Sequence, residues 1–416
     1  PFLSNPTNFF SQNPTNFIFS IMAAQFKPRV LLMEKVHDVA EAAFAQQGFE
    51  VIRPNDGKFT REELEEIIPT IDIIGIRSKT KLPKALLEKA TRLMAIGCYC
   101  IGTDCVDLPY ARERGIPVFN SPYANTRSVA ELVIAEMVML ARQAGDRSKE
   151  MHTGEWNKQS IGCYEVRGKT LGIIGFGHVG MQLCTLAESM GLKVIFCDVV
   201  AKLALGNSQQ VTQKELLATA DFVTLHVPKL ESTKGLIGEA EIQSMKKGSY
   251  LLNLARGNVV DNEAAAAALR SGHLAGAGFD VYPKEPAGHT LDFVNPLLGC
   301  PNTILTPHIG GSTEEAQESI GVEVAGKVIK FINSGSTMGA VNVPQIDNGG
   351  ELEDGFTRVL NFHKDIPGTV RQLNNALTEG NITYQALRTG NGIGYIIVDI
   401  ESSAQQNVQT ALNGLE

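Results

Sequence analysis

Short apolar runs alternate with helical stretches along this chain of 416 residues, and this alternation limits the fold more than any other feature. A first series begins near residue 29 with RVLLME, FEVIR, IDIIGIR and RLMAIGC, and a second begins near residue 170 with TLGIIG, LKVIFCD and DFVTLHVP. Strands that alternate with helices form parallel sheets with helices on both faces. The sequence therefore predicts an α/β fold with doubly wound parallel sheets.

A glycine-rich segment, TLGIIGFGHVG, joins the first strand of the second series to the helix that follows it. Its last three glycines have the spacing of a dinucleotide-binding turn: Gly175 allows the tight turn, Gly177 lets a pyrophosphate approach, and Gly180 lets helix and strand pack closely. Asp198 ends the next strand, where a carboxylate can accept hydrogen bonds from ribose hydroxyls and would repel a 2′-phosphate. The six strands of this series then predict a Rossmann-type domain that binds NAD.

Three polar side chains follow the last three strands of the second series: Arg256, Glu285 and His308. Ligands of parallel α/β sheets lie at the carboxyl ends of the strands, so we expect the three groups to lie together. Histidine can accept and return a proton near neutral pH, a neighbouring glutamate raises its pKa, and arginine binds a carboxylate in two hydrogen bonds. This set suits NAD-linked oxidation of a 2-hydroxy acid. Gly310 and Gly311 after His308 are expected to leave room for the substrate.

Composition excludes several other functions. The net charge of −8 argues against bulk nucleic-acid or anionic-membrane binding, and no run of 18 apolar residues predicts a membrane span. Seven cysteines in a long chain suggest reduced thiols and a cytoplasmic protein. The spacing of Cys98, Cys100 and Cys105 is not that of a zinc site, so we expect no metal.

The segments divide the chain into predicted domains. A stretch rich in Gly, Asn and Ser separates the two α/β halves from a tail with the pattern strand, helix, strand, strand, helix. Residues 1–24 contain a repeated NPTNF motif and are expected to be an unstructured or non-native extension. The other predicted parts are a flavodoxin-like substrate-binding domain (25–124 and 312–340), the NAD-binding domain (125–311), a linker (341–355) and a small α+β domain (356–416).

Several of these motifs resemble one family. GIIGFGHVG, LLNLARGNVVD, GFDVYPKEP and LTPHIGGSTEEAQ resemble the D-2-hydroxyacid dehydrogenases, and IGTDCVDL, NTRSVAELVIAE and GEWNKQS resemble the branch that oxidises 3-phosphoglycerate. The resemblance implies that Arg256 binds substrate, that Glu285 pairs with His308, and that His308 is the acid/base. The NAD contacts that it implies are His178, Val179, Asp198, Leu254, Ala255, Arg256, Asp280, His308, Gly310 and Gly311. Ala255 stands where relatives often have Ser, a change expected to matter little.

A phosphorylated substrate is an anion, so we expect basic side chains from the first half of the chain to bind it. The resemblance implies Arg77, Ser78 and Asn125 as substrate contacts, and Lys79 and Lys158 are further candidates on the walls of a closing cleft. The tail resembles an ACT domain, a small effector-binding module, which implies feedback inhibition by L-serine. His363 and Asp365 would contact the effector, although Asp365 replaces an Asn that is common in relatives. One more strand is expected after ALNGLE, so we expect a truncated C-terminus.

The resemblance implies oxidation of 3-phospho-D-glycerate to 3-phosphohydroxypyruvate, the first step of serine biosynthesis, by a homo-oligomer, expected to be a tetramer. Two alternatives remain open. One is a reductase of 2-oxoglutarate or another 2-oxo acid, because the basic residues do not distinguish a phosphate from a second carboxylate. The other is an NAD(H)-sensing corepressor or scaffold, which can keep the same Arg, Glu and His.

Overall fold

The computed structural model describes residues 17–21, 27–286, 288–347, 350, 352–378, 380–404 and 408, with the backbone alone for residues 17–21. The chain divides into two compact units. One is formed by Asn125–Ala316, and the other by Pro1–Ala124 together with Gln317–Glu416. The predicted domain boundaries, which separate the tail from the first half, stay a prediction.

A seven-stranded sheet, parallel throughout, forms the centre of the Asn125–Ala316 unit, in the order β13-β12-β11-β10-β7-β8-β9. Its strands are β7 (Thr170–Ile174), β8 (Lys193–Cys197), β9 (Gln209–Gln210), β10 (Phe222–Leu225), β11 (Ser249–Asn253), β12 (Leu274–Phe279) and β13 (Thr303–Leu305). Six of these were expected, and the two-residue β9 is an additional edge strand. The arrangement confirms the Rossmann-type prediction.

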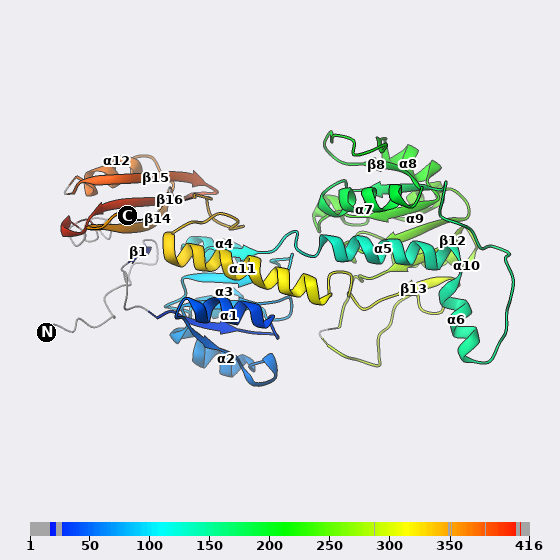
Figure 1. Ribbon diagram of the computed structural model, residues 1–416, viewed down its shortest axis with the longest axis horizontal. Coiled ribbons are helices and arrows are strands. Elements are labelled where there is room, and N and C mark those ends of the chain that lie inside the picture. Colours follow the sequence, from blue (N-terminus) through cyan, green and yellow to red (C-terminus); the bar gives the residue numbers. More distant parts are fainter. Residues whose placement is uncertain are drawn as a thin grey trace. The chain divides into compact units, whose positions relative to one another are not determined.

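Helices cover both faces of this sheet because side chains alternate along each strand. Leu171 and Ile173 of β7 face an apolar cluster shared with α5 (Thr126–Ala141) and α7 (His178–Ser189). Ile174 faces the opposite cluster, shared with α8 (Gln213–Thr219), α9 (Glu239–Ser244) and α10 (Asn262–Arg270). A separate helix, α6 (Ala144–His152), follows α5. Figure 1 shows α5 and α7 on one side of the strands.

The start of α5 differs from the sequence prediction. The run from Ser128 to Gln143 predicts a helix with Ser128 as its cap. In the structure α5 begins two residues earlier, at Thr126, with Asn125 in the capping position. The Ser128 hydroxyl lies 2.9 Å from that of Thr313 instead. Asn125 makes no side-chain capping bond, because its amide packs against Gly311. Ser128 was therefore the wrong choice of cap.

A five-stranded parallel sheet forms the first part of the other unit, in the order β3-β2-β4-β5-β6. This is the flavodoxin-like order, as predicted. Its strands are β2 (Arg29–Leu32), β3 (Glu50–Ile52), β4 (Ile73–Ile76), β5 (Ala95–Cys98) and β6 (Val118–Asn120). One face packs on α1 (Asp38–Gln46) and α11 (Glu314–Ser334), and the other on α2 (Arg61–Ile67), α3 (Lys84–Leu87) and α4 (Leu108–Glu113).

The tail forms an antiparallel sheet of four strands in the order β1-β14-β16-β15. Strands β14 (Phe356–Lys364), β15 (Ile382–Gly390) and β16 (Ile393–Glu401), with α12 (Thr369–Ala376), match the expected α+β pattern. The outer strand β1 (Phe17–Ile21) comes from the segment that was expected to be an unstructured or non-native extension. These five residues are not unstructured, and the non-native alternative stays a prediction. Most of the second helix expected in the tail lies outside the described residues, and Val408, which is described, is helical. The strand expected after Glu416 stays a prediction.

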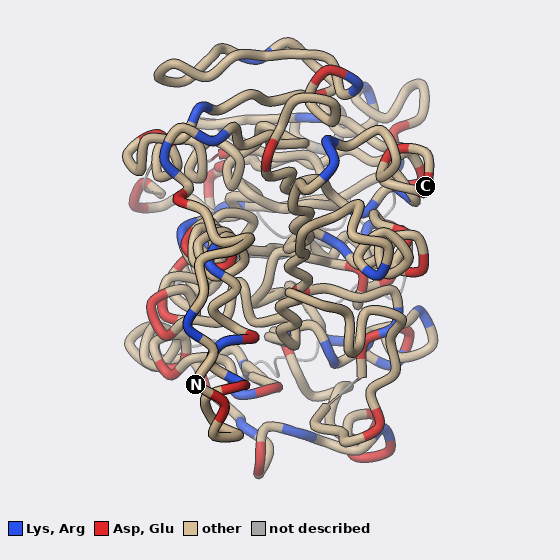
Figure 2. Tube along the Cα trace, turned by 90° about the vertical axis from the view of Figure 1, so that its right-hand side faces the viewer, with Lys and Arg blue, Asp and Glu red and all other residues tan. Residues whose placement is uncertain are grey.

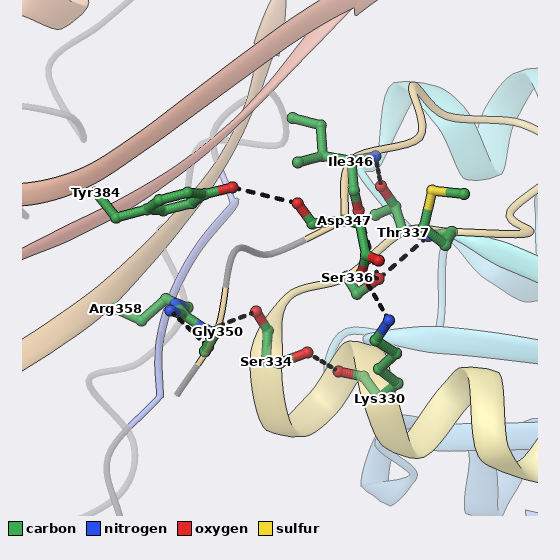
Figure 3. Close-up of polar contacts among 10 residues, drawn as sticks. Lys330, Ser334, Ser336, Thr337, Ile346, Asp347, Gly350, Arg358 and Tyr384 are labelled. Atoms are coloured by element: carbon green, nitrogen blue, oxygen red, sulfur yellow. Dashed lines mark hydrogen bonds and ion pairs between the residues drawn. The ribbon is translucent and has the colours of Figure 1, made fainter. Parts of the chain in front are cut away.

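The expected linker is held by specific contacts, which Figure 3 shows. Arg358 of β14 forms a buried ion pair with Asp399 of β16, at 2.6 Å, and donates to the carbonyl of Ser334 at the end of α11. Lys330 and Tyr384 both bind Asp347, at its carboxylate and its carbonyl respectively. The last sheet is therefore fixed to the end of α11 through Ser334 and Asp347.

Charges of both signs are interspersed along the trace (Figure 2), in keeping with the modest net charge of −8. In the described part of the chain, no helix has both the length and the apolar character needed to cross a membrane. Nor do three or more His, Cys, Asp or Glu side chains gather there as metal ligands would.

Candidate active site

The glycine loop lies between β7 and α7 and has little space for side chains. A Cβ at Gly175, where φ is +93°, would collide with the carbonyl of His226, and one at Gly180 would lie 2.5 Å from the carbonyl oxygen of Gly175. A Cβ at Gly177 would meet nothing within 4 Å. No side chain caps the helix at Gly177, so its positive end is open to an anion. Packing thus requires glycine at positions 175 and 180, and Gly177 leaves the start of the helix accessible to a ligand.

His308 follows β13, and its ring is bound to a carboxylate. Its Nδ1 lies 2.8 Å from Oε2 of Glu285, whose other oxygen accepts the N–H of Tyr282 at 3.0 Å. The hydrogen bond to Glu285 raises the pKa of His308, against the opposing effect of burial. For Glu285, burial acts to raise the pKa, but the bonds from His308 and Tyr282 outweigh it and the pKa is lowered. The pair therefore favours imidazolium and carboxylate, as the sequence predicted.

Asp280, directly after β12, holds the loop that carries His308. Its Oδ1 accepts the Thr306 hydroxyl at 2.6 Å and the N–H of Ile309 at 2.8 Å, and its Oδ2 accepts the N–H of Gly310 at 2.8 Å. Asp280 is only 2% exposed, so these donors neutralise a charge that water does not reach. His308 itself has φ of +57°, which is uncommon for a residue other than glycine. Asp280 thus fixes a loop in an unusual conformation.

The two glycines after His308 have a different explanation from the one expected. A Cβ at Gly310 would lie 2.9 Å from Oδ2 of Asp280, and one at Gly311 would collide with the side-chain amide of Asn125. Close packing within the protein therefore requires these glycines, whether or not a substrate lies beside them.

Arg256 lies in the loop after β11, where its guanidinium donates to the carbonyl of Ala255 at 2.7 Å. The side chain of Asn253 fixes this loop by accepting the N–H of Ala255 and donating to the carbonyl of Arg256, at 3.2 and 3.1 Å. The positive charge of Arg256 acts to lower the pKa of both His308 and Glu285, which places it within electrostatic range of both. The loops after β11, β12 and β13 thus bring together the guanidinium, carboxylate and imidazole groups.

Comparison with known proteins agrees with this geometry. Residues 134–310 match the model of the D-isomer specific 2-hydroxyacid dehydrogenase NAD-binding domain. D-3-phosphoglycerate dehydrogenase of Dictyostelium discoideum is 51% identical over 390 residues, which are 94% of this chain and 95% of that protein. D-3-phosphoglycerate dehydrogenase of Escherichia coli K12 is 48% identical over 382 residues, which are 90% of this chain and 92% of that enzyme. The chain belongs to the D-2-hydroxyacid dehydrogenase family.

Solved structures of this family share the fold. NAD-dependent formate dehydrogenase from Staphylococcus aureus, in complex with NAD, is 29% identical and superposes with a TM-score of 0.63 over 74% of this chain and 96% of its own. The TT0316 protein from Thermus thermophilus is 31% identical, with a TM-score of 0.67 over 74% of this chain and 97% of its own. NAD is the cofactor of this dehydrogenase, and the open turn at Gly177 fits its pyrophosphate.

The predicted cofactor residue Asp198 already has partners within the chain. Its two oxygens accept the N–H groups of Phe176, at 2.9 Å, and Val200, at 3.2 Å. The carboxylate therefore fixes the glycine loop from the end of β8. Its role towards ribose stays a prediction, as do the cofactor contacts assigned to His178, Val179, Leu254 and Ala255.

The predicted substrate and effector residues belong to different parts of the chain. Arg77, Ser78 and Lys79 follow β4 in one unit, and Asn125 and the exposed Lys158 belong to the other. His363 is buried in β14, and its Nδ1 lies 3.2 Å from Oδ1 of Asn361. Asp365 is the second residue after His363 and is exposed. Their roles in binding stay predictions.

One carboxyl group near the site was missed by sequence analysis. Glu136 of α5 is 1% exposed, and neither of its side-chain oxygens has a hydrogen-bond partner among the described residues. Burial, and secondly the charge of Asp280, raise the pKa of Glu136 to about 8. The signal was present in the sequence, because Glu136 lies on the apolar stripe of the helix with Val133 and Leu140.

Proposed function

We propose that this dehydrogenase oxidises 3-phospho-D-glycerate to 3-phosphohydroxypyruvate with NAD. The observation that carries the proposal is the 2.8 Å contact between His308 and Glu285, beside Arg256. The two relatives that are 51% and 48% identical to this chain are named D-3-phosphoglycerate dehydrogenases, which supports this substrate.

The roles of the side chains follow from their positions. Because Nδ1 of His308 is bound to Glu285, Nε2 is the nitrogen that takes the proton from the substrate hydroxyl. Glu285 stabilises the imidazolium that results, and Arg256 binds the substrate carboxylate with its planar fork. The turn at Gly177 and the start of α7 would hold NAD, which would supply the hydride acceptor for the substrate carbon. In the reverse direction, His308 returns the proton to the carbonyl oxygen.

The test is a substrate panel, with NADH consumption followed by absorbance. Phosphohydroxypyruvate should be reduced with a kcat/KM far above those for 2-oxoglutarate and pyruvate. A preference for 2-oxoglutarate would instead favour the second carboxylate as the recognised group. No turnover with any of the three would overturn the proposal and favour a scaffold that senses NAD(H).

We also infer regulation by L-serine through His363 and Asp365, in a cytoplasmic homo-oligomer. The inference rests on the resemblance of the tail to an effector-binding module, together with its attachment to the end of α11 through Arg358. L-Serine added to the reductase assay should lower the rate in the wild type, and less so in the His363→Ala variant. Sedimentation velocity should show a species larger than the 44.9 kDa monomer.

A further inference from the structure

The loop after β4, residues 77–80, is organised by a carboxylate from the turn after the neighbouring strand β2. Oε1 of Glu34 accepts the backbone N–H groups of Arg77, at 3.2 Å, and of Thr80, at 2.6 Å. Oε2 accepts the N–H of Lys79 at 3.0 Å. Three of the four backbone N–H groups in this loop therefore converge on one side chain.

The turn that carries Glu34 has an uncommon backbone conformation. Glu34 and Lys35 have φ values of +60° and +53°, in the left-handed region that residues other than glycine rarely adopt. The N–H of Glu34 donates to the carbonyl of Gly57 at 2.7 Å, and a Cβ at Gly57 would lie 2.9 Å from the nitrogen of Lys35. Gly57 thus supports the turn, which is held in a conformation that brings the Glu34 carboxylate to the loop.

Residues 77–80 are also held at the carbonyl of Arg77. The Cys105 thiol donates to the carbonyl oxygen of Arg77, at 3.5 Å. Within the described residues, the guanidinium of Arg77 and the ammonium of Lys79 have no hydrogen bond or ion pair. The side chains of Ser78 and Lys79 are exposed, and that of Arg77 is partly exposed. The N–H groups of Arg77, Lys79 and Thr80 are committed to Glu34. The side chains of this loop and the N–H of Ser78 are left to bind an anion.

A loop with converging N–H groups would otherwise form an anion-binding concavity of its own. Here the chain's own carboxylate fills that position, and charge-assisted hydrogen bonds of this kind are about twice as strong as neutral ones. Glu34 therefore determines where Arg77 and Ser78 are presented.

We propose that Glu34 is a positioning residue, which fixes residues 77–80 so that Arg77 and Ser78 recognise the phosphate group of the substrate. This inference rests on the proposed function, because it assigns the phosphate to this loop. It also predicts a role in specificity: loss of the Glu34 carboxylate affects phosphorylated substrates and spares substrates without a second anionic group, such as pyruvate.

The test compares three variants in the reductase assay. In Glu34→Gln, one side-chain oxygen becomes an NH₂ group that faces a backbone N–H, so the loop loses at least one hydrogen bond. KM for phosphohydroxypyruvate should rise about tenfold, the effect of losing one charge-assisted bond. The value of kcat, KM for NADH and kcat/KM for pyruvate, which has no second anionic group, should each stay within about twofold. Backbone amide exchange at Lys79 should become faster.

Lys35→Gly is the matched control, because it alters the same turn, suits a positive φ and leaves the carboxylate in place. It should leave KM for phosphohydroxypyruvate unchanged. Arg77→Ala reports on the proposed function separately, and should raise the same KM at least as much as Glu34→Gln does.

The outcomes distinguish the two proposals. A raised KM in Arg77→Ala with an unchanged KM in Glu34→Gln would overturn the role of Glu34 while the phosphate assignment stands. An equal loss with phosphohydroxypyruvate and pyruvate in Glu34→Gln would indicate general damage and would also overturn it. A wild type that does not reduce phosphohydroxypyruvate would overturn the proposed function, and the specificity role with it.

Discussion

Two loops of this dehydrogenase are built in the same way but in different surroundings. Residues 306–310 after β13 and residues 77–80 after β4 each direct three donors to a single carboxylate, that of Asp280 or that of Glu34. Asp280 is 2% exposed and sits at the end of a buried strand, whereas Glu34 is partly exposed, on a turn with two positive φ values.

The difference shows how burial determines whether such a carboxylate contributes to the stability of the fold or only to the position of its loop. Where water is excluded, an unpaired donor or acceptor costs its full desolvation free energy. Near the surface, water replaces a lost bond, so stability changes little and only the position of the loop is affected. We therefore expect the loop at Asp280 to be essential for both folding and catalysis, and the loop at Glu34 to adjust substrate recognition.

The largest effect is expected from removing the side chain of His308, which lies in the loop held by Asp280. His308→Ala should lower kcat for phosphohydroxypyruvate reduction by about 10³-fold, within the usual contribution of a general acid. The dissociation constant for NADH, measured by fluorescence titration, should change by less than about threefold. A variant that keeps a tenth or more of the wild-type kcat would remove the acid/base assignment.

The next effect concerns the stability of the same loop. In Asp280→Asn, an NH₂ group would face the N–H of Ile309 or Gly310 in a buried place, and the free energy of unfolding should fall by about 2 kcal/mol. Urea titration followed by far-UV circular dichroism measures this. Asp292→Asn, at an exposed position, is the control and should change stability by less than about 0.5 kcal/mol. Equal stability of the two variants would contradict the role given to burial.

The smallest effect should come from the partly exposed carboxylate. Glu34→Gln should lower the free energy of unfolding by less than about 1 kcal/mol in the same urea titration, because water can satisfy the freed N–H groups. A larger loss of stability in Glu34→Gln than in Asp280→Asn would contradict the difference proposed between the two loops.

Sequence reasoning found the parts of the site that local pattern determines. The glycine turn is a contiguous motif, and Arg256, Glu285 and His308 each follow a strand, so the rule for parallel sheets brings them to one edge. It could not find Glu34, whose loop partners are 43 to 46 residues away. No short pattern connects two such segments. Glu136 could have been found, because a carboxyl group on an apolar helix stripe is visible in the sequence.

For some residues the structure also shows a cause that sequence reasoning did not foresee. Gly310 and Gly311 were expected to make room for a substrate, yet the atoms that exclude a Cβ belong to Asp280 and Asn125. Asp280 was expected only as a cofactor contact, and in the structure its carboxylate holds the loop beneath His308. Such causes depend on distances between side chains, which the sequence does not contain.

The pairing of His308 with Glu285 is the centre of this account, and the pH dependence of kcat/KM for phosphohydroxypyruvate reduction tests it most directly. Reduction needs the imidazolium, so the rate should fall as pH rises through the raised pKa of His308. In Glu285→Gln the carboxylate charge that raises this pKa is gone, and the alkaline fall should move to lower pH. A fall at the same or higher pH in the variant would contradict the pairing.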